Sequence, residues 1–348
     1  MTINDKLILV TGGSGFIGTN LVEYFLNKNY NVINIDKCSY SSVPEKFKKY
    51  NRNKKYKFIK MNLTNENKLI QVLNKYKPNL IFNLAAESHV DRSIDYPKEF
   101  IKNNINSSVV LIEIIRKLLF KKQLNNIKIV HLSTDEVYGS NVGNPSKEIN
   151  VLEPNSPYSS SKASIDHIYL SYYKTYKIPI LIARCCNNFG PYQFPEKFIP
   201  TIIFNSLQNK QIPIYGKGSN IREWIYVKDT CSALERVMKK GKIGEIYNIG
   251  TGTAINNKNL AIKIYYKLKK RMNLKKLLNP IKYVTDRPAH DIKYSLNCVK
   301  LKKLNWKKKY NFDLALNNTI NWYISNKLWV KSCNKKYTGQ RLGLKNKL

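Results

Sequence analysis

A glycine-rich segment near the N-terminus constrains the fold more than any other feature of this sequence. The segment TGGSGFIG, residues 11–18, follows an apolar run, KLILV, and opens an amphipathic stretch, FIGTNLVEYFLNK. Glycines at this spacing permit a tight turn, let a phosphate approach the backbone and let the helix pack closely on the strand. The start of such a helix offers free N–H groups to an anion. The order of strand, loop and helix therefore predicts a unit that binds the pyrophosphate of a dinucleotide.

Short apolar runs alternate with helical stretches through the first half of the chain. The runs typical of buried strands are KLILVT, NVINID, YKFIKMNL, NLIFNLAA, IKIVHLST and IPILIARC. The alternation predicts an α/β fold, a Rossmann-type doubly wound parallel sheet with helices on both faces. After about residue 190, turn signals such as YGKGSN and DRPAHD separate shorter elements. We therefore expect an NAD-binding domain over 1–190 and a smaller, mainly substrate-binding domain over 191–348, with a strand near 245–250 that returns to the main sheet.

The 348 residues carry a formal net charge of +37, which is compatible with binding to nucleic acid. A nucleic-acid face is expected to be one basic cluster, whereas these lysines are spread along the sequence in pieces such as KKYNRNKKYK and KKLNWKKKY. We expect solvated surface lysines and no dedicated nucleic-acid site.

Membrane and metal partners are not expected either. No apolar run is long enough to span a bilayer, and the first residues lack a signal-peptide pattern, which predicts a cytoplasmic protein. The six cysteines form no C-x-x-C pair and have no histidine at ligand spacing, so neither a metal site nor a disulfide framework is predicted. The adjacent Cys185 and Cys186 are interpreted as small buried residues at a strand end.

An acidic residue at the end of the second predicted strand indicates which dinucleotide is bound. Asp36 closes the run NVINID, where a carboxylate accepts hydrogen bonds from a ribose 2′-hydroxyl. The same carboxylate repels a 2′-phosphate, so NAD is favoured over NADP. The alternative, a purely structural glycine turn, does not explain why strand, loop, helix and acid occur in this order.

Two local patterns supply groups for proton transfer. STDEVYG, residues 133–139, follows IKIVHL, and the carboxyl ends of parallel strands face the ligand crevice. The second pattern is Tyr158 with Lys162 in NSPYSSSKAS, where Ser156 can cap a helix that has Pro157 at its first position. Residues four apart share one helix face. A nearby ammonium and the positive ring of the oxidised cofactor both favour tyrosinate, which makes the tyrosine a candidate base.

Along nearly its whole length the chain resembles the extended short-chain dehydrogenase/reductase family, in its NAD-dependent epimerase/dehydratase branch. The segments that carry the resemblance are TGGSGFIG, NIDK, LAAESHVDRSID, STDEVYG, the Tyr158/Lys162 pair, NNFGPYQFPEKFIP, PIYGKGSNIREWIYVKD, YNIG, DRPAHD and GQRLGL. The resemblance implies a hydro-lyase that converts a nucleotide-linked glucose, with dTDP-glucose expected first, to its 4-keto-6-deoxy sugar.

The resemblance also implies a role for each group of the two patterns. Tyr158 takes the C4 hydroxyl proton while NAD oxidises C4, and the resulting ketone acidifies C5–H. Glu136 is then the base at C5 and Asp135 the acid at the C6 hydroxyl, and the hydride returns to C6. Thr134 bonds the C4 oxygen, and Lys162 holds the nicotinamide ribose and tunes the tyrosine. The adjacent acids could instead be exposed turn residues, since successive residues reach one crevice only where the backbone turns.

Two further sets of side chains follow from the resemblance. Those expected along the cofactor are Gly12, Gly15, Phe16, Ile17, Gly18, Asp36, Lys37, Cys38, Ser39, Asn62, Leu63, Leu84, Ala85, Ala86, Glu87, Ser88, Asn103, Tyr158, Lys162 and Asn188. Those expected on the sugar nucleotide are Ser88, Thr134, Asn187, Lys197, Phe198, Pro213, Ile214, Tyr215, Arg222, Asn257, Arg287, Pro288, Ala289, His290 and Asp291. The two arginines suit a pyrophosphate because a guanidinium can bond two oxygens at once.

At four positions the chain departs from the family pattern. Asn62 stands where the family usually has Asp, Cys186 where it has Ser, Phe189 where it has Tyr, and Lys293 where it has Arg. These changes bear on affinity and on nucleotide choice, and not on the type of reaction.

Three interpretations stay open from the sequence. They are the dTDP-glucose dehydratase, another NAD-linked sugar-nucleotide enzyme such as a UDP-sugar 4,6-dehydratase or a 4-epimerase, and a non-enzymatic binding protein on the same fold. The adjacent Asp and Glu argue against the epimerase, and the intact catalytic set argues against the binding protein. A homodimer is also predicted, because SSVVLIEIIRKLLF and the helix after Pro157 are more apolar than one sheet face requires, and the resemblance implies that they pair across a two-fold axis.

Overall fold

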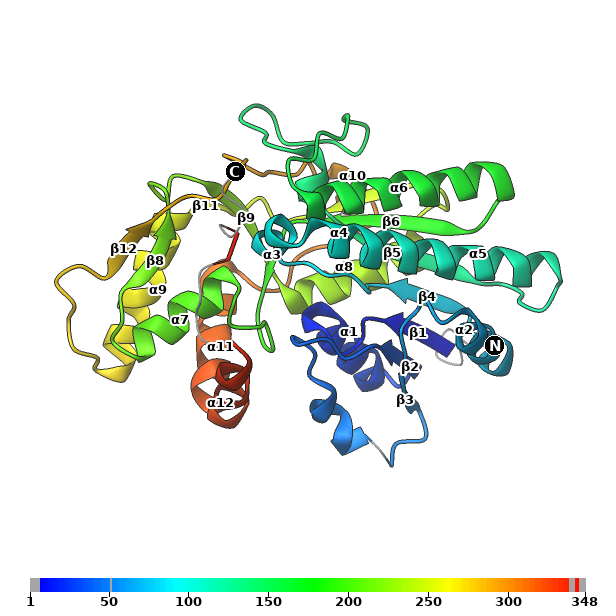
Figure 1. Ribbon diagram of the computed structural model, residues 1–348, viewed down its shortest axis with the longest axis horizontal. Coiled ribbons are helices and arrows are strands. Elements are labelled where there is room, and N and C mark those ends of the chain that lie inside the picture. The colour runs from blue at the N-terminus through cyan, green and yellow to red at the C-terminus, as the bar shows by residue number, and fades with distance from the viewer. Residues whose placement is uncertain (1–6, 51, 338–341, 344–348) are drawn as a thin grey trace.

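Seven parallel strands form the central sheet of the larger part of the molecule (Figure 1). In the computed structural model, which describes residues 7–50, 52–337 and 342–343, the strand order is β10-β6-β5-β4-β1-β2-β3. The strands are β1 (Leu7–Thr11), β2 (Asn31–Asp36), β3 (Tyr56–Lys60), β4 (Leu80–Asn83), β5 (Lys128–Thr134), β6 (Ile180–Cys185) and β10 (Ile246–Ile249). The order reverses between β1 and β4, and ligands of such sheets bind at the carboxyl ends beside that point. The predicted α/β class is confirmed.

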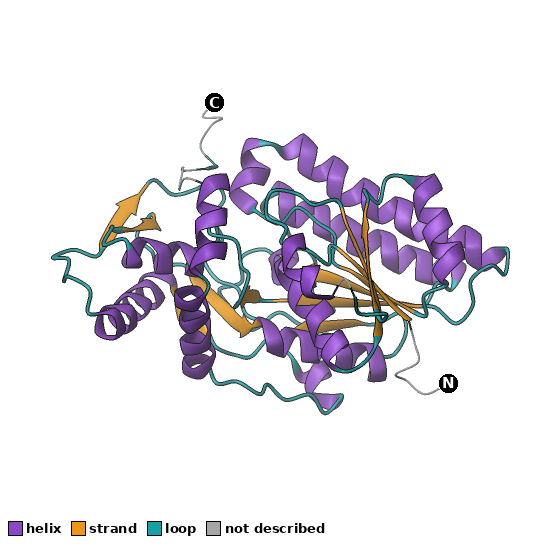
Figure 2. Ribbon diagram, turned by 90° about the horizontal axis from the view of Figure 1, so that it is seen from below, coloured by secondary structure: helices purple, strands orange, loops and turns teal. Residues whose placement is uncertain are grey.

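Helices cover both faces of this sheet, as Figure 2 shows, because successive strand residues point to opposite sides. On β1, Ile8 and Val10 pack into one apolar core and Leu9 into the other. The helices on the first face are α1 (Phe16–Asn27), α8 (Val227–Lys240) and α10 (Val299–Lys303). Those on the second are α2 (Glu66–Tyr76), α5 (Ser107–Phe120) and α6 (Pro157–Tyr176).

Short helical turns lead the chain past the carboxyl edge of the sheet. They are η2 (Pro44–Tyr50), α3 (Val90–Asp95), α4 (Pro97–Ile101), the π-helical η3 (Lys102–Asn106) and the 3-10 turn η4 (Asp135–Tyr138). At the start of α6, Ser156 accepts a hydrogen bond from the backbone N–H of Ser159, whose side chain in turn accepts from the Ser156 N–H. The predicted cap with Pro157 at the first turn is therefore confirmed.

A smaller part of the molecule is built on two further sheets and lies to the left in Figure 1. Its strands are β7 (Asn187–Phe189), β9 (Ile221–Tyr226) and β11 (Ala254–Asn256) in one sheet, and β8 (Ile212–Tyr215) and β12 (Ile281–Val284) in the other. Its helices are α7 (Phe198–Leu207), α9 (Asn257–Met272), α11 (Phe312–Ser325) and α12 (Lys327–Lys336). Aromatic residues fill its core, where the ring of Phe189 lies 5.4 Å from that of Phe312 between centroids.

The chain crosses between the two parts more than once. It leaves the sheet at Cys185, the buried last residue of β6, and returns through α8 to β10, which pairs with β6. Cys186 is buried next to it, so both cysteines lie at a strand end as predicted. Within the described residues no helix is long and apolar enough to cross a bilayer. The terminal GQRLGL segment lies largely outside those residues.

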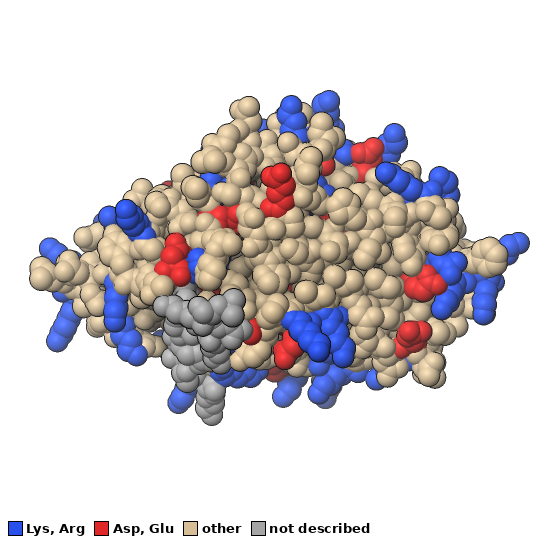
Figure 3. Space-filling view, turned by 45° about the horizontal axis from the view of Figure 1, so that its top comes forward, with Lys and Arg blue, Asp and Glu red and all other residues tan. Residues whose placement is uncertain are grey.

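Lysine and arginine side chains stand at several separate places around the face shown in Figure 3. They are interspersed with uncharged surface and with acidic side chains. On this face the cations are not gathered into one patch, which is the distribution expected for solvated surface lysines.

Candidate active site

A cleft of about 1140 Å³ lies along the carboxyl ends of the central strands and continues between them and the smaller part. Its walls include the glycine loop, the end of β5, the start of α6, and residues of β8 and β9. The cleft thus brings together most of the side chains that the sequence assigns to cofactor and substrate.

The glycine loop is shaped by contacts that leave no room for side chains. Gly12 has a φ of +66°, and a Cβ there would lie 2.8 Å from the Cα of Ala85. A Cβ on Gly18 would lie 2.1 Å from the carbonyl oxygen of Gly12. Gly15 precedes α1 without a side-chain cap, so the first N–H groups of that helix are left for an anion. This cradle fits a pyrophosphate.

Asp36 is held on the cleft wall by three donors. Its Oδ2 accepts a hydrogen bond from the backbone N–H of Ser14 at 3.0 Å. Its Oδ1 accepts from the N–H of Cys38 at 2.7 Å and from the hydroxyl of Ser42 at 3.1 Å. A carboxylate offers about four acceptor positions, so one is left for a ribose hydroxyl. The fixed negative charge fits a dinucleotide without a 2′-phosphate.

The end of β4 is tied to α6 by a residue that sequence reasoning passed over. Asn104 lies fully buried in η3. Its side chain accepts from the N–H of Glu87 at 2.7 Å and donates to the hydroxyl of Ser161 at 3.0 Å. Glu87 also pairs with Lys37 at 2.7 Å, so the strand ends β2 and β4 are bridged across the wall. The neighbour Asn103, which the resemblance assigns to the cofactor, lines the cleft itself.

A tight turn presents both acids of the STDEVYG segment to the cleft. Thr134 ends β5 and caps η4, with its hydroxyl accepting from the N–H of Glu136 at 3.3 Å and donating to Asp135 Oδ1 at 3.2 Å. The 3-10 turn therefore supplies the change of direction that lets successive residues line one cleft. Val137 and Tyr138 continue from it into the core.

Tyr158 and Lys162 both line the cleft from the first two turns of α6, and both are buried. The Nζ of Lys162 donates to the carbonyl of Leu132 at 2.7 Å and lies 3.3 Å from His131 Nε2. Burial lowers the pKa of Lys162 to about 8, although Asp166 opposes this.

The surroundings of Tyr158 do not have the expected electrostatic effect. Burial raises its pKa, and the charges of Glu136 and Asp135 raise it further, against a hydrogen bond from Thr134. Burial and the two carboxylates thus act against tyrosinate, and the expectation that Lys162 and the positive ring of the cofactor favour it stays a prediction.

The two acids lie in different environments. Asp135 is 2% exposed, its Oδ2 has no hydrogen-bond partner among the described residues, and burial with the charge of Glu136 raises its pKa well above the usual range. Burial also raises the pKa of Glu136, but Arg287, Arg222 and Lys197 all act to lower it. The first acid is thus favoured in its protonated form, and the second is the one whose ionised form is stabilised by cations.

Several cations reach the cleft from the smaller part, among them Arg222, Lys197 and Arg287. Arg222, on β9, donates through Nη2 to the carbonyl of Asp291 at 2.8 Å, and its guanidinium lies 4.2 Å from the centre of the Tyr294 ring. Lys197 donates to the carbonyl of Ser88 at 2.6 Å. Arg287 follows β12 and also lines the cleft. This concentration of positive charge suits a diphosphate.

Most predicted site residues line the cleft, but a few do not. Cys38, Pro288, Ala289 and Asp291 are absent from its walls. Cys38 sits at a φ of +62° and turns beside Asp36, whereas the proline and alanine are exposed. Asp291 is buried behind the wall, where it accepts hydrogen bonds from Asn155 at 2.7 Å and from Tyr294.

The positions that depart from the family pattern are accommodated locally. Asn62 lines the cleft with its side-chain oxygen accepting from the N–H of Thr64 at 3.2 Å, and Cys186 lines it as a buried residue. Phe189 packs in the aromatic core, where a hydroxyl would need a partner. Lys293 is not on the cleft wall.

Several residues on the cleft wall or next to it were not anticipated. Tyr40 donates to Glu196 at 2.6 Å, and Arg92 donates to the same carboxylate at 2.9 Å, so these groups link the segment after β2 to the one before α7. His89 and Asp91 also line the cleft. Four of these five residues, all except Tyr40, lie in the segments LAAESHVDRSID and NNFGPYQFPEKFIP, which carry the family resemblance and could have pointed to them. The contacts of Tyr40 and Arg92 with Glu196 join positions 156 and 104 residues apart, and no sequence pattern predicted them.

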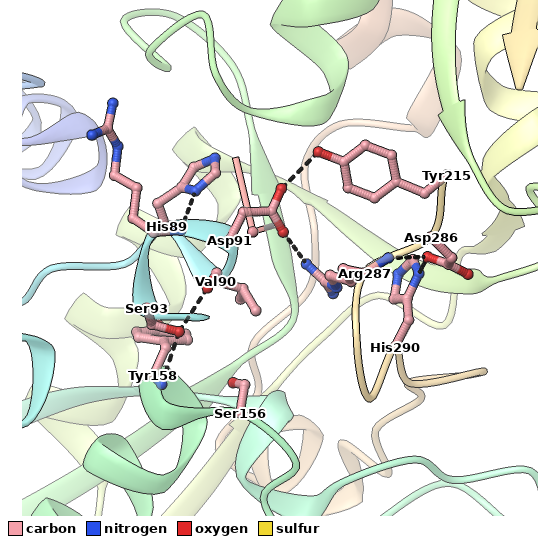
Figure 4. A network of polar contacts seen from close by, with 12 residues as sticks. His89, Val90, Asp91, Ser93, Ser156, Tyr158, Tyr215, Asp286, Arg287 and His290 are labelled. Atoms are coloured by element: carbon pink, nitrogen blue, oxygen red, sulfur yellow. Dashed lines mark hydrogen bonds and ion pairs between the residues drawn. The ribbon is translucent and has the colours of Figure 1, made fainter. Parts of the chain in front are cut away.

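A chain of polar contacts connects the catalytic helix to the smaller part (Figure 4). The backbone N–H of Tyr158 donates to Ser93 Oγ at 3.2 Å, and the same hydroxyl donates to the carbonyl of Val90 at 2.6 Å. The next residue, Asp91, accepts from the Tyr215 hydroxyl at 2.6 Å and pairs with Arg287 at 3.4 Å. Helix α3 thus contacts both sides of the cleft.

The chain belongs to the GDP-mannose 4,6 dehydratase family, whose model matches residues 9–319. It is 38% identical to a probable dTDP-glucose 4,6-dehydratase of Sinorhizobium fredii, over 98% of this chain and 99% of that protein. The predicted resemblance to the NAD-dependent nucleotide-sugar enzymes is confirmed.

Two solved structures extend this likeness to the fold. One is the dTDP-glucose 4,6-dehydratase from Bacillus anthracis in complex with NAD, with 40% identity and a TM-score of 0.84 over 94% of this chain and 99% of that one. The other is the dTDP-glucose 4,6-dehydratase from Streptomyces venezuelae with NAD and TYD bound, with 34% identity and a TM-score of 0.85 over 93% and 98%.

Proposed function

We propose that this protein is an NAD-dependent hydro-lyase that converts dTDP-glucose to its 4-keto-6-deoxy product, a precursor for deoxysugar biosynthesis. The observation that carries the proposal is the meeting of Thr134, Asp135 and Glu136 with Tyr158 and Lys162 in one cleft that also holds the glycine loop. The nucleotide-sugar relatives at 34 to 40% identity support the reaction, the cofactor and the nucleotide.

The chain's own residues supply the proton transfers. Tyr158 receives the C4 hydroxyl proton, and the Thr134 hydroxyl beside it bonds the same oxygen. Glu136 takes the proton from C5 and returns it to C5 after the hydride has been added at C6. Arg287, Arg222 and Lys197 stabilise its ionised form, although burial raises its pKa. Asp135 gives its proton to the departing C6 hydroxyl, since burial raises the pKa of that carboxyl well above its usual range and so favours its protonated form. The environments of the two acids thus support the order of roles that the resemblance implies.

Bound NAD would supply the acceptor for the C4 hydride and, in its reduced form, the donor of that hydride to C6. Gly12, Gly15 and Gly18 would hold its pyrophosphate, Asp36 its adenosine ribose, and Lys162 the ribose of its nicotinamide. The positive nicotinamide would also offset the influences that raise the pKa of Tyr158. Because the hydride is returned, product forms without a net gain of reduced cofactor.

The decisive test is incubation of the purified protein with dTDP-glucose and, separately, with UDP-glucose. Alkali then develops the absorbance of a 4-keto-6-deoxy sugar. Product from dTDP-glucose without accumulation of NADH supports the proposal. Product from UDP-glucose alone reassigns the nucleotide, and a C4 epimer without the alkali-induced absorbance would replace the dehydratase with an epimerase.

We further infer that two copies pair along α5 and α6, and that the protein resides in the cytoplasm. Phe120 at the end of α5 is 86% exposed. Near it Tyr172 donates to Glu113 at 3.0 Å, and the guanidinium of Arg116 lies 4.9 Å from the centre of the Tyr176 ring. Aromatic side chains beside an Arg–Glu ion pair suit a closed two-fold interface.

Light scattering tests the pairing, and cell fractionation tests the location. Phe120→Asp is expected to shift the dimer toward monomer, whereas Leu328→Asp, on α12 and equally exposed at 86%, is expected to leave it unchanged. A wild-type monomer at micromolar concentration would contradict the pairing.

A further inference from the structure

We propose that Asp91 is a positioning residue that sets Tyr215 and Arg287 for the nucleotide part of the substrate. Asp91 is 4% exposed, and its carboxylate reaches both side chains, accepting from the Tyr215 hydroxyl at 2.6 Å and pairing with Arg287 Nη1 at 3.4 Å (Figure 4). The inference rests on the proposed function, because both partners are assigned to the sugar nucleotide.

Asp91 is itself fixed by the helix that carries it. His89 caps α3, its Nδ1 accepting from the backbone N–H of Arg92 at 3.2 Å. Later in the same helix, Ser93 accepts the N–H of Tyr158 at 3.2 Å. One short element therefore holds the backbone of the catalytic tyrosine and the carboxylate that faces the smaller part. The two sides of the cleft are aligned through it.

The geometry distinguishes the two contacts. The bond from Tyr215 is short and holds its ring on the cleft wall. The contact with Arg287 is longer than a charge-assisted hydrogen bond usually is. It holds the guanidinium near its place but leaves several of its N–H donors for a pyrophosphate.

The charges around Arg287 indicate how the Asp91 carboxylate keeps this arginine in place. The cations Arg222 and Lys197 and the acid Glu136 also act on this part of the cleft. Although burial opposes it, the charge of Asp91 keeps the pKa of Arg287 above its usual value, ahead of the contribution from Glu136. Without Asp91, the arginine is expected to turn toward the catalytic base and away from the diphosphate.

The test compares Asp91→Asn, Tyr215→Phe and the double variant in the NAD-loaded protein. For each, KM and kcat are measured with dTDP-glucose, and the Kd of thymidine diphosphate by calorimetry. In Asp91→Asn both KM and Kd are expected to rise about tenfold, the loss typical of one charged hydrogen bond, with kcat changed by less than about twofold. Tyr215→Phe should give a smaller rise, and the double variant no more than Asp91→Asn alone, because the two residues act through one contact.

The matched control is Asp95→Asn, the same loss of charge on the same helix. Asp95 is buried, does not line the cleft, and accepts the backbone N–H of Gly343 at 2.8 Å. Its substitution should leave KM and Kd unchanged. A role in folding alone would lower the melting temperature in either Asn variant without moving nucleotide affinity.

The proposal is overturned if Asp91→Asn binds thymidine diphosphate as tightly as the wild type, or more tightly, since the carboxylate then only competes with the diphosphate. If Asp91→Asn does not fold, Tyr215→Phe decides, because its ring keeps the same volume: unchanged affinity overturns the proposal. A wild-type protein that binds no thymidine diphosphate and forms no product contradicts the proposed function instead.

Discussion

The two walls of the cleft are assembled in different ways. On the cofactor wall, Gly12 follows β1 and Asp36 ends β2, and the register of these two strands fixes their spacing. Gly18, in α1, packs against Gly12. On the opposite wall, Lys197, Arg222 and Arg287 come from separate segments that meet only through two small sheets and an aromatic core. A local pattern therefore specifies the first wall, whereas the second depends on packing between distant segments.

The strongest test of this division is Glu136, which lies on the strand side but is surrounded by cations of the other wall. Glu136→Gln cannot accept the C5 proton, so turnover should fall by about a hundredfold to ten-thousandfold. Oxidation at C4 should continue slowly and leave a 4-keto-glucose with reduced cofactor, seen by single-turnover absorbance, while exchange of the C5 hydrogen with deuterated solvent is lost. Glu153→Gln, an exposed acid off the cleft wall, is the control. Near-normal turnover in Glu136→Gln would remove it from the base role.

The next effect is expected on the cofactor wall alone. In Gly18→Ala the new Cβ meets the carbonyl oxygen of Gly12, so the loop must move, at a cost of about 1–3 kcal/mol in folding free energy. NAD affinity should fall while thymidine diphosphate still binds, as calorimetry with each ligand can show. Gly143→Ala is the control, since its nearest neighbour would be 3.8 Å away. Equal losses for both ligands would mean that the two walls are not separable.

A third change concerns the acid at the boundary between the walls. Burial raises the folded-state pKa of Asp135 above that of the unfolded chain, so its ionised form destabilises the fold. This cost is absent below about pH 4, where both states are protonated, and grows as pH rises until the folded-state pKa is passed. Asp135→Asn should therefore be more stable than the wild type at pH 8, with the difference shrinking toward pH 4. Urea unfolding at several pH values measures it, and a gain that does not depend on pH would argue against an ionisation effect.

The smallest effect is expected in the core of the second wall. Tyr323 donates to the carbonyl of Gln193 at 2.6 Å, and both groups are buried. Tyr323→Phe should cost about 1 kcal/mol of folding free energy, the usual value of one such bond, and leave NAD affinity unchanged. Tyr266→Phe, on an exposed side chain, should change neither quantity. Weaker NAD binding in Tyr323→Phe would show that this core also supports the cofactor wall.

The same difference explains how far the sequence could predict the structure. Strand ends, the glycine loop and the α6 cap follow from local pattern, so Asp36, Thr134 and Tyr158 could be placed in advance. Asp135 and Glu136 can share one cleft only because a 3-10 turn follows Thr134. The sequence pattern did not predict this turn, although the proposed roles of the two acids need it. The bridges from Tyr40, Asp91 and Asn104 depend on which distant segments meet. The raised pKa of Tyr158 depends on burial, which no local pattern reports.

The return of β10 to the central sheet limits how this chain can be divided. A fragment that ends near residue 190 would lack both β10, which covers the edge of β6, and α8, which covers one face of the sheet. It would expose the unpaired backbone groups of an apolar edge strand, a template for aggregation. During synthesis, the edge of the nucleotide-binding sheet stays open until some sixty more residues have been added. Segments of the smaller part thus lie in the chain between strands of the central sheet. The two sides of the catalytic cleft are therefore expected to fold and unfold together.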